Sequence, residues 1–397
     1  MRTVTPERVG LSSSRLDRVN CVMRSYVEQE KLPGAITMIA RHGQLVHAEC
    51  FGLRDIEAQK PMQIDTLFPI FSMTKPILAV AMMILYEEGR YQLFDPLSRF
   101  ISEFKDVKVI KKTSEEGIEL TDPDRDITIH DLLNQTAGIL SDGWLSPQLS
   151  KLIDEVDLYQ PDITLQEFNK RLVKLPLIHQ PGKAWRYGEG PEVLGHLVEL
   201  ISGMSFDTFL EKRIFEPLGM TDTRFGILED QRDRLAKLYG YSDAGGFVET
   251  VEFAPRLIPS PIPRGGFGLI STAPDYLRFL KMLLNKGELG DVRILGRKTV
   301  EYITRNHLSK ELVPIELAPG YSINGYGYGI LFGVMVDAVQ AGFLGSEGEY
   351  YWGGLSTIFG IDPKEQLIFL LMTRLEYPGH LPIYYAFRTL VYQTIIE

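Results

Sequence analysis

The chain has 397 residues, of which 44% are apolar and 24% charged, and 52 acidic against 42 basic residues give a formal net charge of -10. This composition is that of an ordinary folded protein and excludes the disordered and collagen-like classes. The length predicts two lobes. Because no basic stripe could follow a phosphate backbone, we expect no nucleic-acid partner.

Several kinds of segment and site are not expected in this chain. The N-terminal residues lack the apolar core of a signal peptide and no run of about 18 apolar residues occurs, which favours a cytoplasmic protein without a membrane partner. Cys21 and Cys50 are too few for a disulfide framework, lack zinc-site spacing, and are expected to be buried thiols. The seven histidines show no metal-ligand spacing with a third ligand, and no glycine-rich phosphate loop is present, so no metal or cofactor is expected.

The predicted elements begin with a hairpin. Residues 35–52 read as two strands around a His42-Gly43 turn, so the chain is expected to open with sheet. Residues 76–88 follow with the apolar spacing of a buried helix, and Gly89 is a natural end for it. The middle third is predicted to be mostly helical, with helices at 131–133, 192–201 and 206–215.

Strands return beyond about residue 225. Residues 326–334 and 367–373 are strand-like, and the apolar run 384–396 is typical of a terminal helix that packs on a sheet. The order of elements predicts an α/β (α+β) protein. Its sheet domain comprises residues 1–75 and 225–397, and a mostly helical domain, residues 76–224, interrupts it.

The first candidate for chemistry is the motif Ser72-Met73-Thr74-Lys75. A separation of three residues puts the hydroxyl and the amine one turn apart on one helix face. Pro76 lacks an N–H group, so the helix must begin close to Ser72, where unpaired N–H groups and the positive dipole end can hold an oxyanion. The lysine can act as a base when neutral, a form that burial favours. For the tetrapeptide alone, a helix cap at Ser72 and a solvated Lys75 are the simpler interpretation, because Ser-x-x-Lys is common by chance.

The context of this motif decides between the two interpretations. Residues 68–76 resemble the serine β-lactamase and penicillin-binding-protein superfamily, specifically its class C-like branch. The resemblance covers nearly the whole chain and continues in order through residues 87–89, 93–96, 127–139, 180–188, 213–223, 265–272 and 352–354. It implies a β-lactamase-like fold, in which an antiparallel sheet flanked by helices carries an inserted mostly helical domain and the active site lies between the two. It also implies an acyl-enzyme on Ser72.

The second family motif falls on Tyr187. By the resemblance, Tyr187 is the tyrosine whose phenol faces the nucleophile and helps carry protons; the simpler interpretation is a buried aromatic residue. Lys75 and Tyr187 are expected to titrate as a coupled unit, so no single base is assigned. The β-lactamase pattern Tyr-x-Asn is here Tyr187-Gly188-Glu189. A carboxylate thus replaces an amide that contacts the substrate, which weakens an antibiotic-degrading interpretation.

The third family motif is Lys-Thr-Gly in β-lactamases, where the lysine attracts the substrate carboxylate. Here the matching place holds Trp352-Gly353-Gly354, the version shown by family VIII carboxylesterases, which mainly cleave small esters. Trp352 offers an aromatic wall to an apolar group, although a packing residue at a strand end would look the same. The resemblance puts the second oxyanion donor, beside the N–H of Ser72, on the N–H of Leu355. The run from there to Asp362 is one residue shorter than usual, so this register stays open.

A Ser-His-Asp triad is the main alternative machinery. The chain contains no Gly-x-Ser-x-Gly elbow, and His130 is expected at the start of a helix near the lobe interface. No histidine is therefore included among the candidate catalytic residues.

The favoured function is a carboxylesterase that hydrolyses small, short-chain esters. The same residues could open a β-lactam, cleave a D-amino-acid peptide or transfer an acyl group, since fold and nucleophile do not set the acceptor. A non-hydrolytic acyl-binding sensor would instead keep a persistent adduct. The natural ester and the oligomeric state, including a homo-oligomer, stay open, and we expect substrate choice to reside in residues 141–175.

Overall fold

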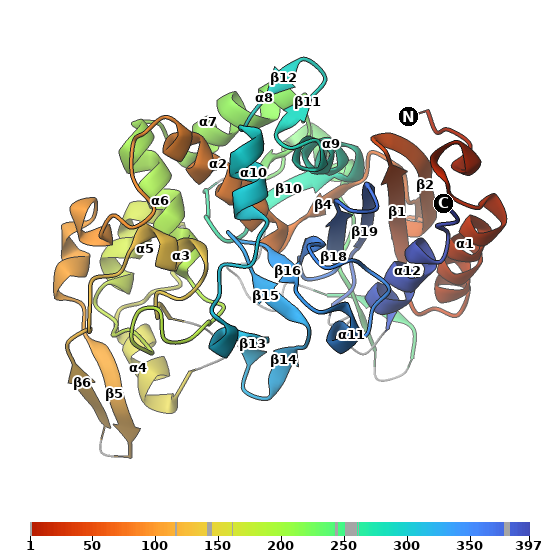
Figure 1. The fold of residues 1–397 in the computed structure, drawn as a ribbon. Coiled ribbons are helices and arrows are strands. Elements are labelled where there is room, and N and C mark those ends of the chain that lie inside the picture. The colour runs from red at the N-terminus through yellow and green to blue at the C-terminus, as the bar shows by residue number, and fades with distance from the viewer. Residues whose placement is uncertain are drawn as a thin grey trace.

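An eight-stranded antiparallel sheet is the centre of the molecule (Figure 1). The computed structural model describes residues 2–115, 117–140, 145–160, 162–242, 245–250, 260, 262–376 and 382–397. Along the sheet the strands follow the order β15-β16-β17-β18-β19-β1-β2-β3. Their bounds are β1 Gly34–Arg41, β2 Gln44–Asp55, β3 Lys60–Pro61, β15 Tyr326–Tyr328, β16 Gly333–Met335, β17 Tyr350–Gly353, β18 Thr357–Asp362 and β19 Leu367–Thr373.

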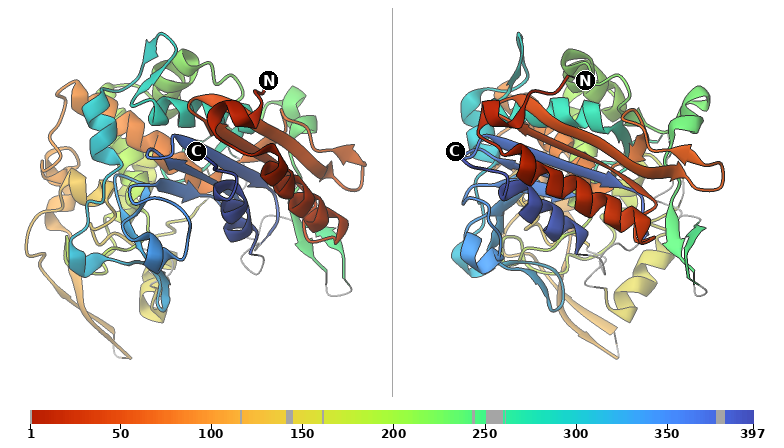
Figure 2. Two further views of the ribbon diagram at one scale, coloured as in Figure 1. Left: turned by 45° about the vertical axis from the view of Figure 1, so that its right-hand side comes forward. Right: turned by 90° about the vertical axis from the view of Figure 1, so that its right-hand side faces the viewer.

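The sheet joins the two ends of the chain. Its central pair is β1 with β19, in the register that sets Ala35 opposite Thr373 and Arg41 opposite Leu367. All eight residues of β1 and all seven of β19 are buried, so both faces of the sheet centre must be covered. Helices α1 (Ser13–Glu28) and α12 (Ile383–Tyr392) lie side by side on one face, as Figure 2 shows, and α9 (Ala273–Leu284) packs on the other.

A mostly helical lobe lies beside the sheet (Figure 1). Its centre is α2 (Thr74–Glu87), whose first twelve residues are buried, packed against α6 (Gly190–Ser202). Around this pair lie α3 Ile129–Leu133, α4 Pro147–Glu155, α5 Leu165–Leu172, α7 Phe206–Leu210, α8 Glu216–Leu218, the 3-10 turns η3 Leu97–Arg99 and η4 Ser102–Asp106, the π-helical turn η6 Glu211–Phe215, and a hairpin of β5 Val109–Ser114 and β6 Gly117–Thr121. One buried apolar cluster runs from this lobe to the α9 face of the sheet, and a second fills the α1 and α12 face.

Short elements complete the molecule. They are η1 Pro6–Val9, β4 Leu67–Pro69, η2 Phe71–Met73, β7 Arg224–Phe225, η7 Glu229–Arg234, β8 Tyr239–Tyr241, β9 Phe247–Glu249, β10 Leu269–Thr272, β11 Glu288–Leu289, β12 Val292–Arg293, α10 Arg297–Ile303, η9 Lys310–Leu312, β13 Ile315–Ala318, β14 Tyr321–Ile323 and α11 Ala338–Ala341. The two chain ends meet beside the sheet, where the Ser12 N–H donates to Thr394 O at 2.9 Å and the Ile396 N–H to Gly10 O at 3.0 Å.

Most of the predicted elements are confirmed. The 35–52 hairpin is β1 and β2 around a turn in which His42 and Gly43 both have positive φ, 50° and 73°. The helix predicted at 76–88 is α2, the 192–201 helix is α6 and ends at Gly203 in the left-handed region, and residues 367–373 form β19. The antiparallel sheet flanked by helices is the predicted fold class.

Three predictions are wrong in detail and a fourth is incomplete. The chain opens with helix α1 rather than with sheet: Ser12 caps it by accepting the Arg15 N–H at 3.4 Å, and Leu16, Val19 and Met23 bury one face. Residues 326–334 are two strands, β15 and β16, because the chain reverses between them.

The other two differences concern burial and the helical lobe. Cys21 is exposed and Cys50 half-buried, so neither thiol is a core residue. The mostly helical lobe also contains the β5–β6 hairpin, which the helical prediction missed.

Three further expectations concern membrane-spanning helices, the domain limits and the substrate-selecting stretch. In the described part of the chain no single helix is long and apolar enough to cross a membrane; the bent pair Gly190–Ser202 and Phe206–Leu218 together meets the length and composition criteria. The domain limits at residues 75/76 and 224/225 stay a prediction. Residues 141–144, at the start of the expected substrate-selecting stretch, lie outside the described residues.

Candidate active site

Ser72 lies at a strand-to-helix junction. Strand β4 pairs with β10, and the Ile70 N–H donates to Leu269 O at 2.9 Å, which anchors the chain before the serine. Phe71 then adopts a φ of 44°, a left-handed conformation that is unfavourable for a residue with a side chain and is found mainly where a site needs it. Ser72 is the middle residue of the 3-10 turn η2, which runs directly into α2. The helix is therefore predicted correctly to begin next to the serine.

Lys75 lies one turn after Ser72 and points to it. Its Nζ donates to Ser72 Oγ at 3.1 Å and to Gly266 O at 2.8 Å, and the residue is 4% exposed. The same ammonium lies 4.6 Å from the centre of the Tyr187 ring. A buried amine with these neighbours can take a proton from the serine when it is neutral.

Tyr187 completes a three-residue proton group with Ser72 and Lys75. Its hydroxyl is hydrogen-bonded to Ser72 Oγ, and either oxygen can be the donor. The sequence separates these two residues by 115 positions, and the loop before α6 brings the phenol to the serine. This arrangement gives the serine proton two places to go, the lysine nitrogen and the phenol oxygen.

Four aromatic residues form the wall behind these groups. The ring centres of Tyr187 and Trp352 are 5.6 Å apart, those of Trp352 and Tyr328 5.2 Å, and those of Tyr328 and Trp185 5.0 Å. Offset and edge-to-face contacts at these distances are favourable. Burial raises the pKa of Tyr328 well above its ordinary value, so this phenol stays protonated behind the site.

The third motif lies at the tip of the β17–β18 hairpin. The Gly354 N–H donates to Thr357 O at 2.8 Å, which leaves Leu355 and Ser356 as a two-residue turn. A Cβ atom on Gly354 would lie 2.6 Å from Ile70 O, so the hairpin tip contacts the chain just before Ser72. Because the Gly354 amide is used inside the hairpin, Leu355 carries the next amide along the chain that could face an oxyanion; its role as second donor stays a prediction.

All the predicted site residues line one cleft of about 530 Å³. Ser72, Lys75, Tyr187 and Leu355 border it together with the Trp352-Gly353-Gly354 motif. The rest of its wall is rich in aromatic side chains, from Phe71, Phe267, Tyr321, Tyr326, Phe343, Tyr351, Tyr384 and Tyr385. Such a cleft suits an apolar ligand with a few polar anchors.

Glu189 lies on the border of the same cleft, where β-lactamases carry an amide. Its carboxylate accepts the Tyr159 hydroxyl at 3.0 Å, and its N–H donates to Leu140 O at 2.9 Å. The structure thus puts a carboxylate side chain on the wall of the cleft.

The histidines lie away from this chemistry. None of the described residues that line the cleft is a histidine. His130 is the second residue of α3 and contacts His307 across the lobe interface, with Nε2 3.0 Å from Nδ1. No cluster of three or more His, Cys, Asp or Glu side chains that could hold a metal ion occurs among the described residues.

Sequence reasoning missed two residues next to the proton group. Gly266 supplies the carbonyl that holds Lys75, and Glu192 accepts the Gly265 and Gly266 N–H groups at 3.0 and 2.9 Å. One signal was available: Glu192 is a charged residue that directly precedes the apolar pair Val193-Leu194 at the head of the helical run 192–201. The partner of that charge could not be read from the sequence.

Known proteins resemble this chain over nearly its full length. The family model described as Beta-lactamase matches residues 19–392. Protein Rv1367c of Mycobacterium tuberculosis (strain ATCC 25618 / H37Rv) is 33% identical over 363 residues, which cover 90% of this chain and 89% of that protein. Esterase EstB of Burkholderia gladioli is 29% identical over 419 residues, covering 98% of each chain. Among solved structures, EstCE1, described as a hydrolase with promiscuous acyltransferase activity, superposes with a TM-score of 0.81 at 24% identity, over 96% of this chain and 99% of that one.

Proposed function

The chain belongs to the β-lactamase family and is a serine hydrolase, and we propose that it is a carboxylesterase of the family VIII type, with Ser72 as its nucleophile. One observation carries the proposal. The Ser72 hydroxyl contacts both the Lys75 amine and the Tyr187 phenol inside an aromatic-walled cleft. A serine at hydrogen-bonding distance from an amine and a phenol that can exchange protons with it can be activated as a nucleophile.

In the proposed reaction, Ser72 Oγ attacks the ester carbonyl carbon and its proton passes to the Lys75 and Tyr187 pair. The N–H groups of Ser72 and Leu355 stabilise the oxyanion of the tetrahedral intermediate. The intermediate collapses by breaking the bond to the alcohol, which leaves with the proton. Water then attacks the acyl-serine, giving its proton to the same pair, and the carboxylic acid departs as Ser72 regains its hydrogen.

The charges around the cleft favour esters over β-lactam antibiotics, which carry a carboxylate. Two cationic side chains line the described part of the cleft, Lys75 and Arg388. Lys75 is bonded to Ser72 and Gly266, and the charge of Arg388 is paired with the buried Glu349. With Trp352 in place of the third-motif lysine, the described part of the cleft has no cation beyond these two, whose charges already serve the nucleophile and Glu349. The aromatic wall supports a small ester with an apolar acyl or alcohol group.

The test compares the wild type with Ser72→Ala on p-nitrophenyl butyrate and on a chromogenic cephalosporin. Ser25→Ala, on α1 and away from the cleft, is the matched control. We expect ester turnover in the wild type and the control, little cephalosporin cleavage, and loss of ester turnover in Ser72→Ala. Ester turnover that survives in Ser72→Ala would remove the nucleophile assignment, and strong cephalosporin turnover would make the protein a β-lactamase.

Mass spectrometry of the same reactions separates the remaining alternative. A transient butyryl adduct on Ser72 is expected if water hydrolyses the acyl-enzyme. An adduct that accumulates without turnover would instead favour the acyl-binding sensor.

The mouth of the cleft supports a second candidate, acyl transfer to an alcohol. Tyr321 and Tyr385 are 56% and 54% exposed, and Phe343 stacks on Tyr385 with ring centres 5.4 Å apart. This aromatic surface offers an acceptor alcohol a place beside the acyl-enzyme, and EstCE1 is described as having promiscuous acyltransferase activity. With p-nitrophenyl butyrate and 2-phenylethanol, formation of phenylethyl butyrate beside butyrate would support transfer; butyrate alone would restrict the enzyme to hydrolysis.

A further inference from the structure

Glu192 is a buried carboxylate that the proposed reaction does not use. It is the third residue of α6 and is 1% exposed, among the buried neighbours Val193, Leu194 and Leu197. An acidic residue in the first turn of a helix commonly lies at the surface, where its charge interacts favourably with the positive end of the helix dipole. Burial of the whole side chain costs far more than that interaction returns, so the carboxylate must have strong partners.

Its partners belong to another segment of the chain. The two carboxylate oxygens accept the consecutive N–H groups of Gly265 and Gly266, at 3.0 and 2.9 Å. A Cβ atom on Gly265 would lie only 1.9 Å from Pro191 O. The backbone of this segment therefore lies directly against the start of α6, and glycine is required for that approach.

The same segment holds the lysine of the proton group. Gly266 O accepts the Lys75 Nζ at 2.8 Å, and Lys75 in turn donates to Ser72 Oγ at 3.1 Å. A Cβ atom on Gly266 would lie 3.1 Å from Glu192 Oε1 and 3.3 Å from Lys75 Nζ. The carboxylate and the amine are thus neighbours on one side of Gly266.

We propose that Glu192 is a positioning residue, which fixes the Gly266 carbonyl that aims Lys75 at Ser72 and whose charge stabilises the ammonium form of Lys75. This inference rests on the proposed function, in which Lys75 must be neutral to accept the serine proton. Glu192 thereby sets the lower end of the pH range in which the enzyme works.

The charged groups around Glu192 come from two elements. Burial raises the pKa of Glu192, while Arg264, the two glycine amides and Lys75 oppose that effect. Arg264 lies in the segment before β10, with its guanidinium over the Phe168 ring of α5 at 5.4 Å. Lys75 comes from α2, and on its other side it faces Tyr187. From α5, the neutral Asn169 side chain donates to the Glu192 carbonyl at 3.2 Å.

The test is the pH profile of kcat/KM in Glu192→Gln and Glu192→Asp full-length proteins. The amide of Glu192→Gln keeps the shape and removes the charge, and its NH2 group cannot accept one of the two glycine N–H groups, so the maximal rate should fall as well. Because the ammonium form of Lys75 loses support, the acidic limb should also move to lower pH by about one unit. Glu192→Asp keeps the charge but is too short to span both amides. We expect its acidic limb to stay near that of the wild type, while its maximal rate falls.

Glu199→Gln is the matched control. Glu199 lies on the same helix, accepts a backbone N–H, that of Phe206, at 3.1 Å, and has a pKa that burial raises. It has no contact with the proton group among those the structure gives, so its variant should keep the wild-type profile. A lowered rate with an unmoved acidic limb in Glu192→Gln would reduce Glu192 to a structural residue and overturn the proposal.

A second measurement covers the case in which Glu192→Gln folds poorly. The rate constant for labelling of Ser72 by a fluorophosphonate, followed by mass spectrometry across pH, depends on the folded molecules alone and not on their amount. A shift of the labelling profile in Glu192→Gln supports the inference, and an unchanged profile contradicts it. If the wild type is not labelled on Ser72 at all, the proposed function fails rather than the role of Glu192.

Discussion

Tyr187 has two separable interactions in the cleft. Its hydroxyl is bonded to Ser72 Oγ, and its ring packs between Trp185 and Trp352, with ring centres 6.4 and 5.6 Å away. The hydroxyl belongs to the proposed proton path, and the ring belongs to the wall. A substitution that removes one and keeps the other therefore tests the path alone.

Tyr187→Phe should abolish proton transfer through the phenol and preserve the packing of the ring. We expect kcat for p-nitrophenyl butyrate to fall about 10²–10⁴-fold, the usual contribution of a positioned acid or base, with little change in melting temperature because the ring contacts remain. Tyr159→Phe is the control, since that hydroxyl donates to Glu189 outside the path. If both variants were equally active, Tyr187 would have no part in proton transfer.

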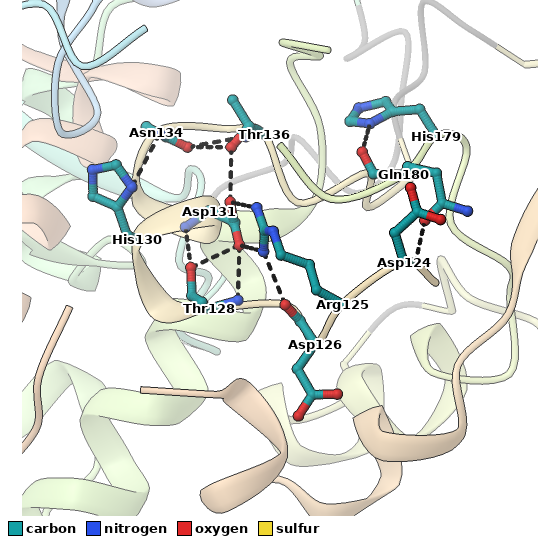
Figure 3. A network of polar contacts seen from close by, with 10 residues as sticks. All are labelled: Asp124, Arg125, Asp126, Thr128, His130, Asp131, Asn134, Thr136, His179 and Gln180. Carbon is teal, nitrogen blue, oxygen red and sulfur yellow. Dashed lines mark hydrogen bonds and ion pairs between the residues drawn. The ribbon is translucent and has the colours of Figure 1, made fainter. Parts of the chain in front are cut away.

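At the scale of elements, a network of polar contacts surrounds the short helix α3 (Figure 3). Asp131 accepts two hydrogen bonds from Arg125, at 2.6 and 2.8 Å, and two from Thr128, at 2.8 and 2.7 Å. Thr136 donates to the same carboxylate at 3.2 Å and accepts the Gly182 N–H at 2.8 Å. One buried carboxylate thus joins the capping box of α3 to the segment before α6.

Asp131→Asn should weaken this network and with it the fold. We expect the free energy of unfolding at pH 7 to fall by about 1–3 kcal/mol, because Arg125 loses its charged acceptor. Asp126→Asn is the control, since that side chain points away from the network in Figure 3. Urea unfolding at several pH values measures the free energy of unfolding of both variants. Equal losses would show that the Asp131 carboxylate contributes no more to stability than the Asp126 carboxylate does.

The pH dependence of this loss has a definite sign. Burial alone would raise the pKa of Asp131, but the bonds from Arg125 and Thr128 outweigh it and hold the pKa below its ordinary value. The stabilisation is therefore complete above the unfolded-state pKa of about 3.9 and is lost as the pH falls through the folded-state value. The difference between wild type and Asp131→Asn should shrink below about pH 4.

The β17–β18 hairpin offers a test of how closely it must approach the nucleophile. A Cβ atom on Gly354 would lie 2.5 Å from Thr357 Oγ1 and 2.6 Å from Ile70 O, whereas one on Gly353 would lie 3.1 Å from Thr357 O. Gly354→Ala should push the hairpin tip from the Ser72 junction and lower kcat/KM on the order of 10–100-fold. Gly353→Ala should have a much smaller effect, and equal kinetics of the two variants would contradict this account.

At the scale of the whole molecule, the two lobes share buried contacts as well as the cleft. One apolar cluster includes Ile36 of β1, Leu197 of α6 and Phe332 beside β16, so it crosses from sheet to helices. His130 of α3 and His307, after α10, pair across the same interface, and His307 Nε2 lies 2.8 Å from Tyr302 O. Two imidazoles at this distance share one hydrogen bond only while at least one of them is neutral.

This pair should make the fold sensitive to mild acid. Burial first, and then His307, lower the pKa of His130 to about 4, and Asp131 opposes them while Arg125 adds to them. Burial and Arg305 lower the pKa of His307. A folded-state pKa below the unfolded value of about 6.5 means that the stability is complete above that pH and is lost as the pH falls toward 4.

His130→Gln should therefore flatten the dependence of melting temperature on pH between about 6.5 and 4, although it lowers stability at pH 7. His42→Gln, in the exposed turn between β1 and β2, should keep the wild-type dependence. Thermal unfolding at half-unit steps of pH measures the slope. A slope in His130→Gln equal to that of the wild type would mean that another group governs the acid sensitivity.

The sequence by itself determined the features that depend on near neighbours. The spacing of Ser72 and Lys75 fixes their separation of one helical turn, alternation and a His-Gly turn fix the first hairpin, and the apolar runs fix α2, α6 and β19. Helix α1 follows the same local rules, with Ser12 as its cap, but its apolar face is narrow and the rest of it is polar, so its helical pattern is weak. These features need no knowledge of the rest of the fold.

The family resemblance extends the predicted features to Tyr187 and Trp352, which the sequence pattern alone would leave as buried aromatic residues. Only the tertiary structure decided which distant groups meet. The contact of Tyr187 with Ser72 spans 115 positions, that of Glu192 with Gly265 spans 73, and that of His130 with His307 spans 177. Contacts of this kind follow from the packing of whole elements, since a residue's own sequence neighbourhood specifies its local conformation but not the segment that packing brings against it.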